Sequence, residues 1–270
     1  MNKTTRIALA TEDLSIRFGG LKALDSVTFA ARAGEIFSII GPNGAGKTTL
    51  FNCISGLYQP TSGRVALEGR DTARLRPHQL AGLGLSRTFQ NLQIFFQMSV
   101  IQNVMVGRHL NEESNFLFDF LGLPSVRRQN DLSRSIAMDY LKKVNLEDMA
   151  DAPAGSLPYG GLKRLEIARA LATEPKVLLL DEPAAGCNPV EATELEALIR
   201  SLANPSMTII LVEHNMKLVM TISDRILVLN SGRVLCEGIP EEVRTNAEVI
   251  GAYLGEQEGE GSQEAMHAAS

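Results

Sequence analysis

The feature that most constrains the fold is a glycine-rich stretch, residues 41–49, between two segments of different character. It reads Gly-Pro-Asn-Gly-Ala-Gly-Lys-Thr-Thr and fits the phosphate-binding pattern G-x-x-x-x-G-K-[ST]. Residues 36–40 before it form an apolar run typical of a buried strand, and residues 50–54 after it are compatible with a helix. Because the pattern requires strand, loop and helix in this order, a chance glycine-rich turn is the weaker interpretation.

The chemistry of phosphate binding explains the residue types in this loop. Glycines let backbone N–H groups turn toward phosphate oxygens without a Cβ in the way, and the following helix adds the positive end of its dipole. Lys47 is predicted to bind the β- and γ-phosphates, Thr48 to ligate Mg²⁺, and Thr49 to reach the α-phosphate. The predicted nucleotide-binding residues of the loop are Gly41, Asn43, Gly44, Gly46, Lys47, Thr48 and Thr49.

A second chemical feature follows a later apolar run. Residues 177–180 read as a buried parallel strand, and Asp181 and Glu182 come directly after it. A carboxylate in this position is the usual partner of a phosphate loop, because it holds Mg²⁺ opposite the loop. We therefore predict Asp181 as a metal ligand and Glu182 as the general base that activates or orients the attacking water.

Composition excludes several classes of protein. With 270 residues, 44% of them apolar, the chain can bury a sizeable core. A net charge of -5 argues against nucleic acid as a partner. The three cysteines form no C-x-x-C pair, so we expect neither a disulfide framework nor a zinc site, and a reducing cytosol fits. No apolar run approaches the roughly 18 residues that span a membrane, so a membrane role would need a spanning partner.

Strands and helices alternate along most of the chain. Strands at 14–18, 27–31 and 64–69 predict a small β-layer. Strands at 208–212, 225–229 and 233–236, with helices at 161–173, 191–202 and 216–222, predict an α/β fold whose sheet is largely parallel. We expect one domain over residues 1–255, with a helical lobe at approximately 91–160 inserted, and a disordered tail at 256–270.

Residues 111–131 break the helical periodicity of that lobe. The stretch mixes polar residues with phenylalanines at 116, 118 and 120. We interpret it as an insertion or surface loop, and the alternative is that its phenylalanines contact a partner.

Together these motifs resemble those of the ATP-binding-cassette (ABC) ATPases over nearly the whole chain. The resemblance implies that Phe18 stacks on adenine, that Gln90 joins the ATP site and its Mg²⁺ to the helical lobe, and that His214 is the switch histidine. It also implies that residues 157–161, Leu-Pro-Tyr-Gly-Gly, form the signature loop, in which Tyr159 and Gly160 face an ATP held by a partner subunit. Catalysis is then assigned to Gln90, Glu182 and His214, and metal binding to Thr48, Gln90 and Asp181.

Several segments look like one subgroup, the ATPases of the LivG kind that energise import of branched-chain amino acids. These segments are residues 18–24, 87–90, 164–169, 182–186, 212–216 and 238–255. The resemblance implies a cytoplasmic subunit, peripheral on the inner face of the membrane, with a second related ATPase, two membrane permeases and a periplasmic solute-binding protein as partners. ATP-driven closure of two ATPases would pull on the permeases through a groove around Gln90 and residues 91–96. ATPases of urea or other amide importers look much alike and remain the alternative.

The signature loop departs from the family pattern. Its second position, usually a serine that donates to the partner's γ-phosphate, is Pro158, which has neither a hydroxyl nor an N–H group. One hypothesis is that the composite site using this signature hydrolyses ATP slowly, and the other is that the remaining N–H groups suffice. The alternative from another class of protein is a soluble ABC ATPase that acts on ribosomes or DNA. The single phosphate loop and the net negative charge of the chain argue against this alternative.

Overall fold

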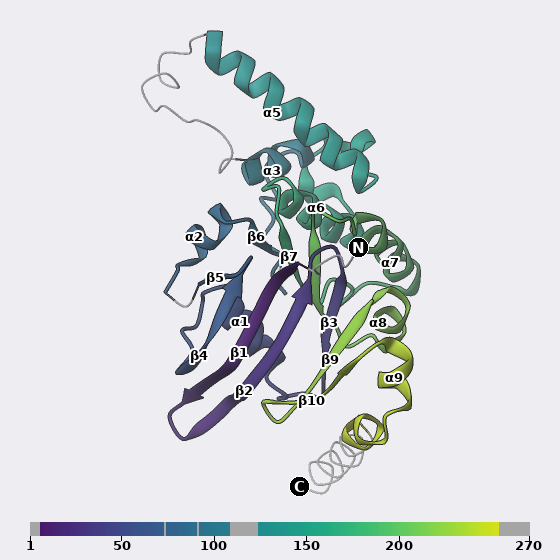
Figure 1. Cartoon of the computed structure of the whole chain (residues 1–270). Helices are drawn as coiled ribbons and strands as arrows, with labels where there is room; N and C mark the ends of the chain where they lie inside the picture. The colour runs from purple at the N-terminus through teal and green to yellow at the C-terminus, as the bar shows by residue number, and fades with distance from the viewer. Residues whose placement is uncertain (1–5, 73, 91, 109–123, 254–270) are drawn as a thin grey trace, which may run out of the picture. The chain divides into compact units, whose positions relative to one another are not determined.

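The computed structural model describes residues 6–72, 74–90, 92–108 and 124–253 (Figure 1). They belong to two compact units, one formed by residues 1–77 with 204–270 and the other by residues 78–203. We call them the first and the second unit and describe each by itself.

The first unit contains an antiparallel sheet with strand order β2-β1-β4-β5. The strands are β1 (Ile7–Phe18), β2 (Leu21–Arg32), β4 (Ser62–Leu67) and β5 (Arg70–Asp71). This sheet confirms the small β-layer. However, β1 and β2 are each 12 residues long, more than twice the predicted length. Register shifts along their pairing interrupt the alternation of buried and exposed residues, which hides the full strands from sequence periodicity.

The same unit also contains the strand that leads into the glycine-rich loop. Strand β3 (Ile36–Ile40) pairs in parallel with β8 (Thr208–Val212) and β9 (Arg225–Asn230), and β10 (Arg233–Gly238) pairs antiparallel with β9. Every residue of β3 and β8 is buried, as continuous apolar runs in parallel sheets require. Helices α1 (Lys47–Ile54), α8 (Met216–Ile222) and α9 (Pro240–Thr245) also belong to the unit, and residues 247–253 are helical as well. The rings of Phe29 and Phe37 stack at 5.2 Å and join the two sheets.

The second unit places helices around a short parallel pair of strands, β6 (Leu85–Arg87) and β7 (Val177–Asp181). Its helices are α2 (Pro77–Gly82, starting at the boundary), α3 (Val100–Gly107), α5 (Pro124–Lys143), η2 (Glu147–Met149), η3 (Ala154–Ser156), α6 (Tyr159–Leu171) and α7 (Pro189–Leu202). Helices α3, α5 and α6 pack on one another (Figure 1). The predicted α/β class, with parallel strands beside an antiparallel sheet, is confirmed.

The interpretation of residues 111–131 as a loop is wrong for its last part. Helix α5 begins at Pro124, a residue favoured at the first helical position because its fixed φ suits the helix. Further along the helix, Ala137 and Leu141 are fully buried four residues apart. The polar start of the helix therefore gave no periodic signal. The phenylalanines at 116, 118 and 120 and the tail at 256–270 lie outside the described residues.

The segments that the structure describes include no helix of the length and apolar character needed to cross a membrane.

Candidate functional site

The glycine-rich loop lies between β3 and α1, as the motif predicts. Lys47 begins α1, and its ammonium group donates hydrogen bonds to the carbonyl oxygens of Gly41 at 2.6 Å and Pro42 at 2.8 Å. The lysine is only 6% exposed, so the loop wraps around this charge. Thr48 and Asn43 are exposed at the same end of the helix. The loop thus presents a buried cation and a helix N-terminus together, which is an arrangement suited to a polyphosphate.

Two glycines of this loop are required by its backbone. Gly41 has a φ of 151° and Gly46, which caps α1, a φ of 102°. A Cβ on Gly41 would lie 2.2 Å from the carbonyl oxygen of Leu229, and one on Gly46 would lie 2.8 Å from that of Ala23. Any side chain at either position would therefore displace neighbouring backbone.

Phe18, the last residue of β1, forms an exposed aromatic pair with Tyr58. Phe18, predicted to stack on adenine, is 46% exposed. Its ring makes an edge-to-face contact with Tyr58 at a centroid distance of 5.3 Å. Sequence analysis missed Tyr58, because an aromatic residue after a helix carries no motif of its own. The two rings are nearly perpendicular, at 73°, and Phe18 is exposed enough to meet a planar ligand.

His214 lies two residues after the end of β8 and is exposed. Its backbone N–H donates to the carboxylate of Glu213 at 3.1 Å, and Glu213 itself is only 3% exposed. Asn215, the next residue, caps helix α8 by accepting a hydrogen bond from Leu218 N–H. The histidine is thus held at a defined turn between strand and helix.

In the second unit, Asp181 ends the buried strand β7 as predicted. It is 3% exposed, and its carboxylate pairs with the guanidinium of Arg87 at 2.7 Å. The backbone N–H of Asp181 donates to the hydroxyl of Thr88 at 3.3 Å. Arg87 was not predicted as a site residue. Its partner lies 94 positions later in the chain, so no local pattern reveals the pair.

Glu182 and Gln90, both predicted as catalytic, are in direct contact. The side-chain amide of Gln90 donates to the Glu182 carboxylate at 3.1 Å. Glu182 has a φ of 48°, in the left-handed region that residues with a Cβ rarely adopt. Backbone strain of this kind concentrates at functional sites, because the surrounding structure must hold it. The second unit therefore brings together Gln90, Asp181 and Glu182.

Replacement of Arg87 tests how much its ion pair with Asp181 contributes to the stability of the fold. We expect Arg87→Met to lower the free energy of unfolding by about 3–5 kcal/mol, because it leaves the Asp181 carboxylate buried without this partner. Denaturant titration of the full chain measures the loss. Arg134→Met is the matched control, since Arg134 pairs with Asp151 at the surface and should contribute only about 0–1 kcal/mol. Equal costs for the two variants would contradict a structural role for the Arg87 pair.

The proposed signature loop begins α6. Pro158 caps the helix without a side-chain hydrogen bond. The Tyr159 ring packs on Gly186, where a Cβ would lie 3.0 Å from it. The N–H of Gly160 donates to the carboxylate of Glu191 on α7 at 3.0 Å, a contact that sequence analysis did not anticipate.

The predicted metal ligands are a hydroxyl, a carboxylate and a side-chain amide, from Thr48, Asp181 and Gln90. Oxygen donors of this kind suit Mg²⁺, which takes one or two protein carboxylates together with phosphate oxygens. Among the described residues, no group of three or more His, Cys, Asp or Glu side chains is arranged to hold a metal by itself.

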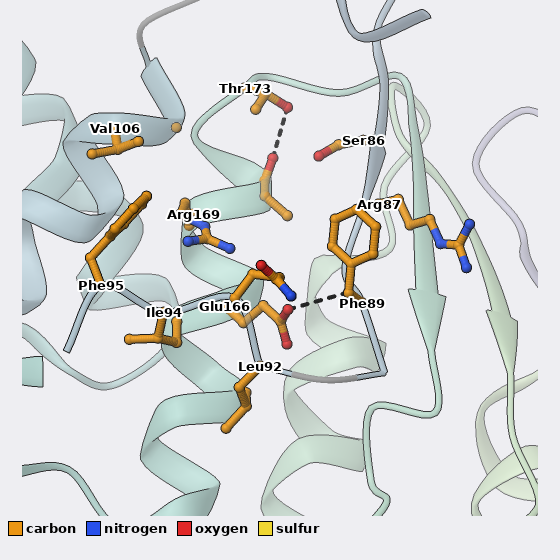
Figure 2. A pocket seen from close by; sticks show the side chains of 13 residues that line it. Ser86, Arg87, Phe89, Leu92, Ile94, Phe95, Val106, Glu166, Arg169 and Thr173 are labelled. Carbon is orange, nitrogen blue, oxygen red and sulfur yellow. Dashed lines mark hydrogen bonds between the residues drawn. The ribbon is translucent and has the colours of Figure 1, made fainter. Parts of the chain in front are cut away.

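A pocket of about 540 Å³ opens beside Phe89 in the second unit (Figure 2). Apolar side chains dominate its walls, namely those of Phe89, Leu92, Ile94, Phe95 and Val106. Two charged residues of α6, Glu166 and Arg169, also line it. Figure 2 shows the Arg169 guanidinium pointing into the pocket, where it lies over the Phe95 ring at 5.7 Å.

The two charged residues Glu166 and Arg169 differ in their hydrogen bonds. Burial raises the pKa of the Glu166 carboxyl, although hydrogen bonds from the backbone N–H groups of Phe89 and Gln93 act in the opposite direction. Those bonds hold the carboxylate in place, and the distance from the Phe89 nitrogen to the Glu166 carboxylate oxygen is 3.2 Å. Arg169 makes no hydrogen bond or ion pair within the described part of the chain; burial lowers its pKa, and the nearby charge of Glu166 acts in the opposite direction. Its guanidinium donors thus remain available inside an apolar pocket.

Comparison with known protein families gives two matches. The family described as "ABC transporter" matches residues 24–185. A second family, described as "Branched-chain amino acid ATP-binding cassette transporter", matches residues 233–259.

Individual proteins are similar over nearly the full length. The high-affinity branched-chain amino acid transport ATP-binding protein BraF of Pseudomonas aeruginosa is 46% identical over 93% of this chain and 99% of that protein. The protein LivG of Salmonella typhimurium, described in the same words, is 47% identical over 92% and 98%. Among solved structures, an ATP-binding cassette of an ABC transporter in its ADP conformation superposes with a TM-score of 0.81 at 32% identity, covering 93% of this chain and 100% of that one. A nucleotide-free cassette gives 0.79 at 32% identity, over 92% and 98%.

Proposed function

Because the chain belongs to the ABC transporter family, we propose that it is the ATP-hydrolysing subunit that energises an importer of branched-chain amino acids. The observation that carries this proposal is the similarity, over nearly the whole chain, to ATP-binding proteins of high-affinity branched-chain amino acid transport. The match of residues 233–259 to the branched-chain family supports the same substrate class.

We assign the chemistry to residues of both units, as parts of one ATPase domain over residues 1–255 with a helical lobe at approximately 91–160. Phe18 stacks on the adenine, and the loop residues Gly41, Asn43, Gly44, Gly46, Lys47, Thr48 and Thr49 bind the phosphates. Thr48, Gln90 and Asp181 would hold Mg²⁺, which would supply neutralisation of the phosphate charge there. Glu182 takes a proton from the attacking water, and His214 contacts the γ-phosphate. The strained backbone of Glu182 and its hydrogen bond from Gln90 support the role of Glu182.

The proposed assembly contains a second ATPase subunit, two permeases and a periplasmic solute-binding protein. Each ATP is held between the phosphate loop of one ATPase and Tyr159 and Gly160 of the other. The chain carries one of each element, which suits a dimer. Its place is on the cytoplasmic face of the membrane, where it is held by the permeases.

The pocket beside Phe89 is the proposed contact with a permease. Its apolar walls suit a segment with apolar side chains, and the guanidinium of Arg169 suits a carboxylate on that segment. A charge pair buried in this way fixes the register of the two proteins as well as adding affinity.

Substitution of Arg169 tests this contact. We expect Arg169→Met to reduce the amount of permease that copurifies with the chain by at least about tenfold, because a carboxylate of the permease would be buried unpaired. The variant keeps the aliphatic stem, and Arg134→Met at the exposed surface is the control. Quantitative mass spectrometry of both preparations measures the ratio of permease to ATPase. Equal recovery would contradict a permease contact through Arg169.

The proposal as a whole is tested by purifying the tagged chain from detergent-solubilised membranes of its own cell. Two related permeases and a second short ATPase should remain bound. Binding assays on the associated periplasmic protein then distinguish a branched-chain amino acid from urea or another amide. Recovery of ribosomal proteins, or of no membrane protein, would instead support a soluble ATPase.

A further inference from the structure

A single carboxylate links the beginnings of two helices in the second unit. Glu191 is the third residue of α7, and one of its oxygens accepts the N–H of Asn188 at 3.0 Å, which completes a capping box. The other oxygen accepts the N–H of Gly160, in the first turn of α6, at 3.0 Å. The approach is close, since a Cβ on Gly160 would lie 2.8 Å from the Glu191 carboxyl carbon.

The first-turn N–H groups of a helix attract anions, because they have no partners within the helix and lie at the positive end of its dipole. At the start of α6 the capping residue is Pro158, which has no N–H and makes no side-chain cap. The anion that accepts from Gly160 in this structure is therefore the carboxylate of the same chain. It occupies the position that a phosphate oxygen would take on this N–H group.

We propose that Glu191 restrains ATP-driven association by occupying Gly160 until the partner-held ATP displaces it. The inference rests on the proposed function, in which Gly160 receives the γ-phosphate of an ATP bound by the other ATPase subunit. A carboxylate and a phosphate cannot both accept the same N–H, and their like charges repel at this distance. Glu191 thus sets the ATP concentration at which two subunits close, and it returns to Gly160 after the phosphate leaves. It is a positioning residue, because it acts through Gly160.

The test uses the full chain with the second ATPase subunit that copurifies with it, and measures their association by sedimentation velocity in the presence of a non-hydrolysable ATP analogue, which takes the place of ATP and prevents turnover at either site. Adding Glu191→Ala should lower the nucleotide concentration for half-maximal association by about 10- to 100-fold, the equivalent of one charge-assisted hydrogen bond. Adding Glu191→Gln should lower it by a similar factor, because its one amide oxygen stays on Asn188 and its amide nitrogen cannot accept the Gly160 N–H. Glutamine also retains the capping box, so this variant keeps the test valid if the alanine variant does not fold.

Glu194→Gln is the matched control. Glu194 lies three residues further along α7 and also bonds to α6, through Arg164 at 2.7 Å, but away from the helix start. The Glu194→Gln variant should therefore associate at the same nucleotide concentration as the parent protein. Unchanged or weaker association in the Glu191→Gln variant would overturn the inference while leaving the proposed function standing, because a purely structural Glu191 predicts that result. Absence of any nucleotide-dependent association between the parent chain and the second ATPase subunit would overturn the proposed composite site and the inference with it.

Discussion

Replacement of Lys47 by alanine is expected to raise the Kd for ATP by about 10- to 100-fold, because the β- and γ-phosphates lose a charge-assisted hydrogen bond. The structure adds a second reason. The ammonium group also bonds to the carbonyl oxygens of Gly41 and Pro42, so its removal takes a buried partner from the loop itself. Isothermal titration calorimetry with ATP measures the change directly.

Two further variants make this prediction specific. Lys47→Arg should not restore affinity, because the planar guanidinium cannot replace a compact ammonium group within a closed loop. Lys142→Ala, which removes an exposed lysine paired with Asp139 on α5, should leave the Kd unchanged. Full affinity in the Lys47→Ala variant would contradict the assignment of residues 41–49 as the phosphate-binding loop.

Substitution of Glu182 by glutamine should lower the ATPase rate by about 10²- to 10⁴-fold, the typical contribution of a general base. ATP affinity should be nearly unchanged, since the substitution preserves shape and the residue is assigned to the attacking water, away from the binding contacts. Single-turnover measurements at saturating ATP separate the chemical step from binding.

Glu174→Gln is the control for this variant. Glu174 also has a positive φ, of 55°, and it pairs with Arg108 at the end of α3. It therefore matches the backbone conformation of Glu182 without its place at the end of β7. A loss of rate common to both variants, or a large rise in Kd in the Glu182 variant, would argue against the role of general base.

The parts of the site that the sequence predicted are those set by local structure. Strand β3 is an unbroken apolar run, and the glycines after it admit only a tight turn, so the position of Lys47 at the start of α1 follows from a few adjacent residues. The same holds for Asp181 at the end of β7. In both cases the element and the chemical group are consecutive in the chain, and no long-range information is needed.

The parts that were missed depend on contacts between distant residues or on weak patterns. The pairing of Arg87 with Asp181 and the bond from Gly160 to Glu191 join residues 94 and 31 positions apart. The capping box of Asn188 and Glu191 has a local signature and could have been found, but its second hydrogen-bond partner could not. The start of α5 was missed because its first residues are polar, so periodicity gave no signal before the buried residue Ala137.

The most direct test of the central claim is uptake of labelled leucine by cells that lack this chain. Expression of the wild-type chain should restore uptake, and equal expression of the Glu182→Gln variant should not, because transport requires ATP turnover by this subunit. Uptake of labelled urea should be the same in all strains. Leucine uptake that is unaffected by loss of the chain, or that is restored equally by both forms, would contradict the account.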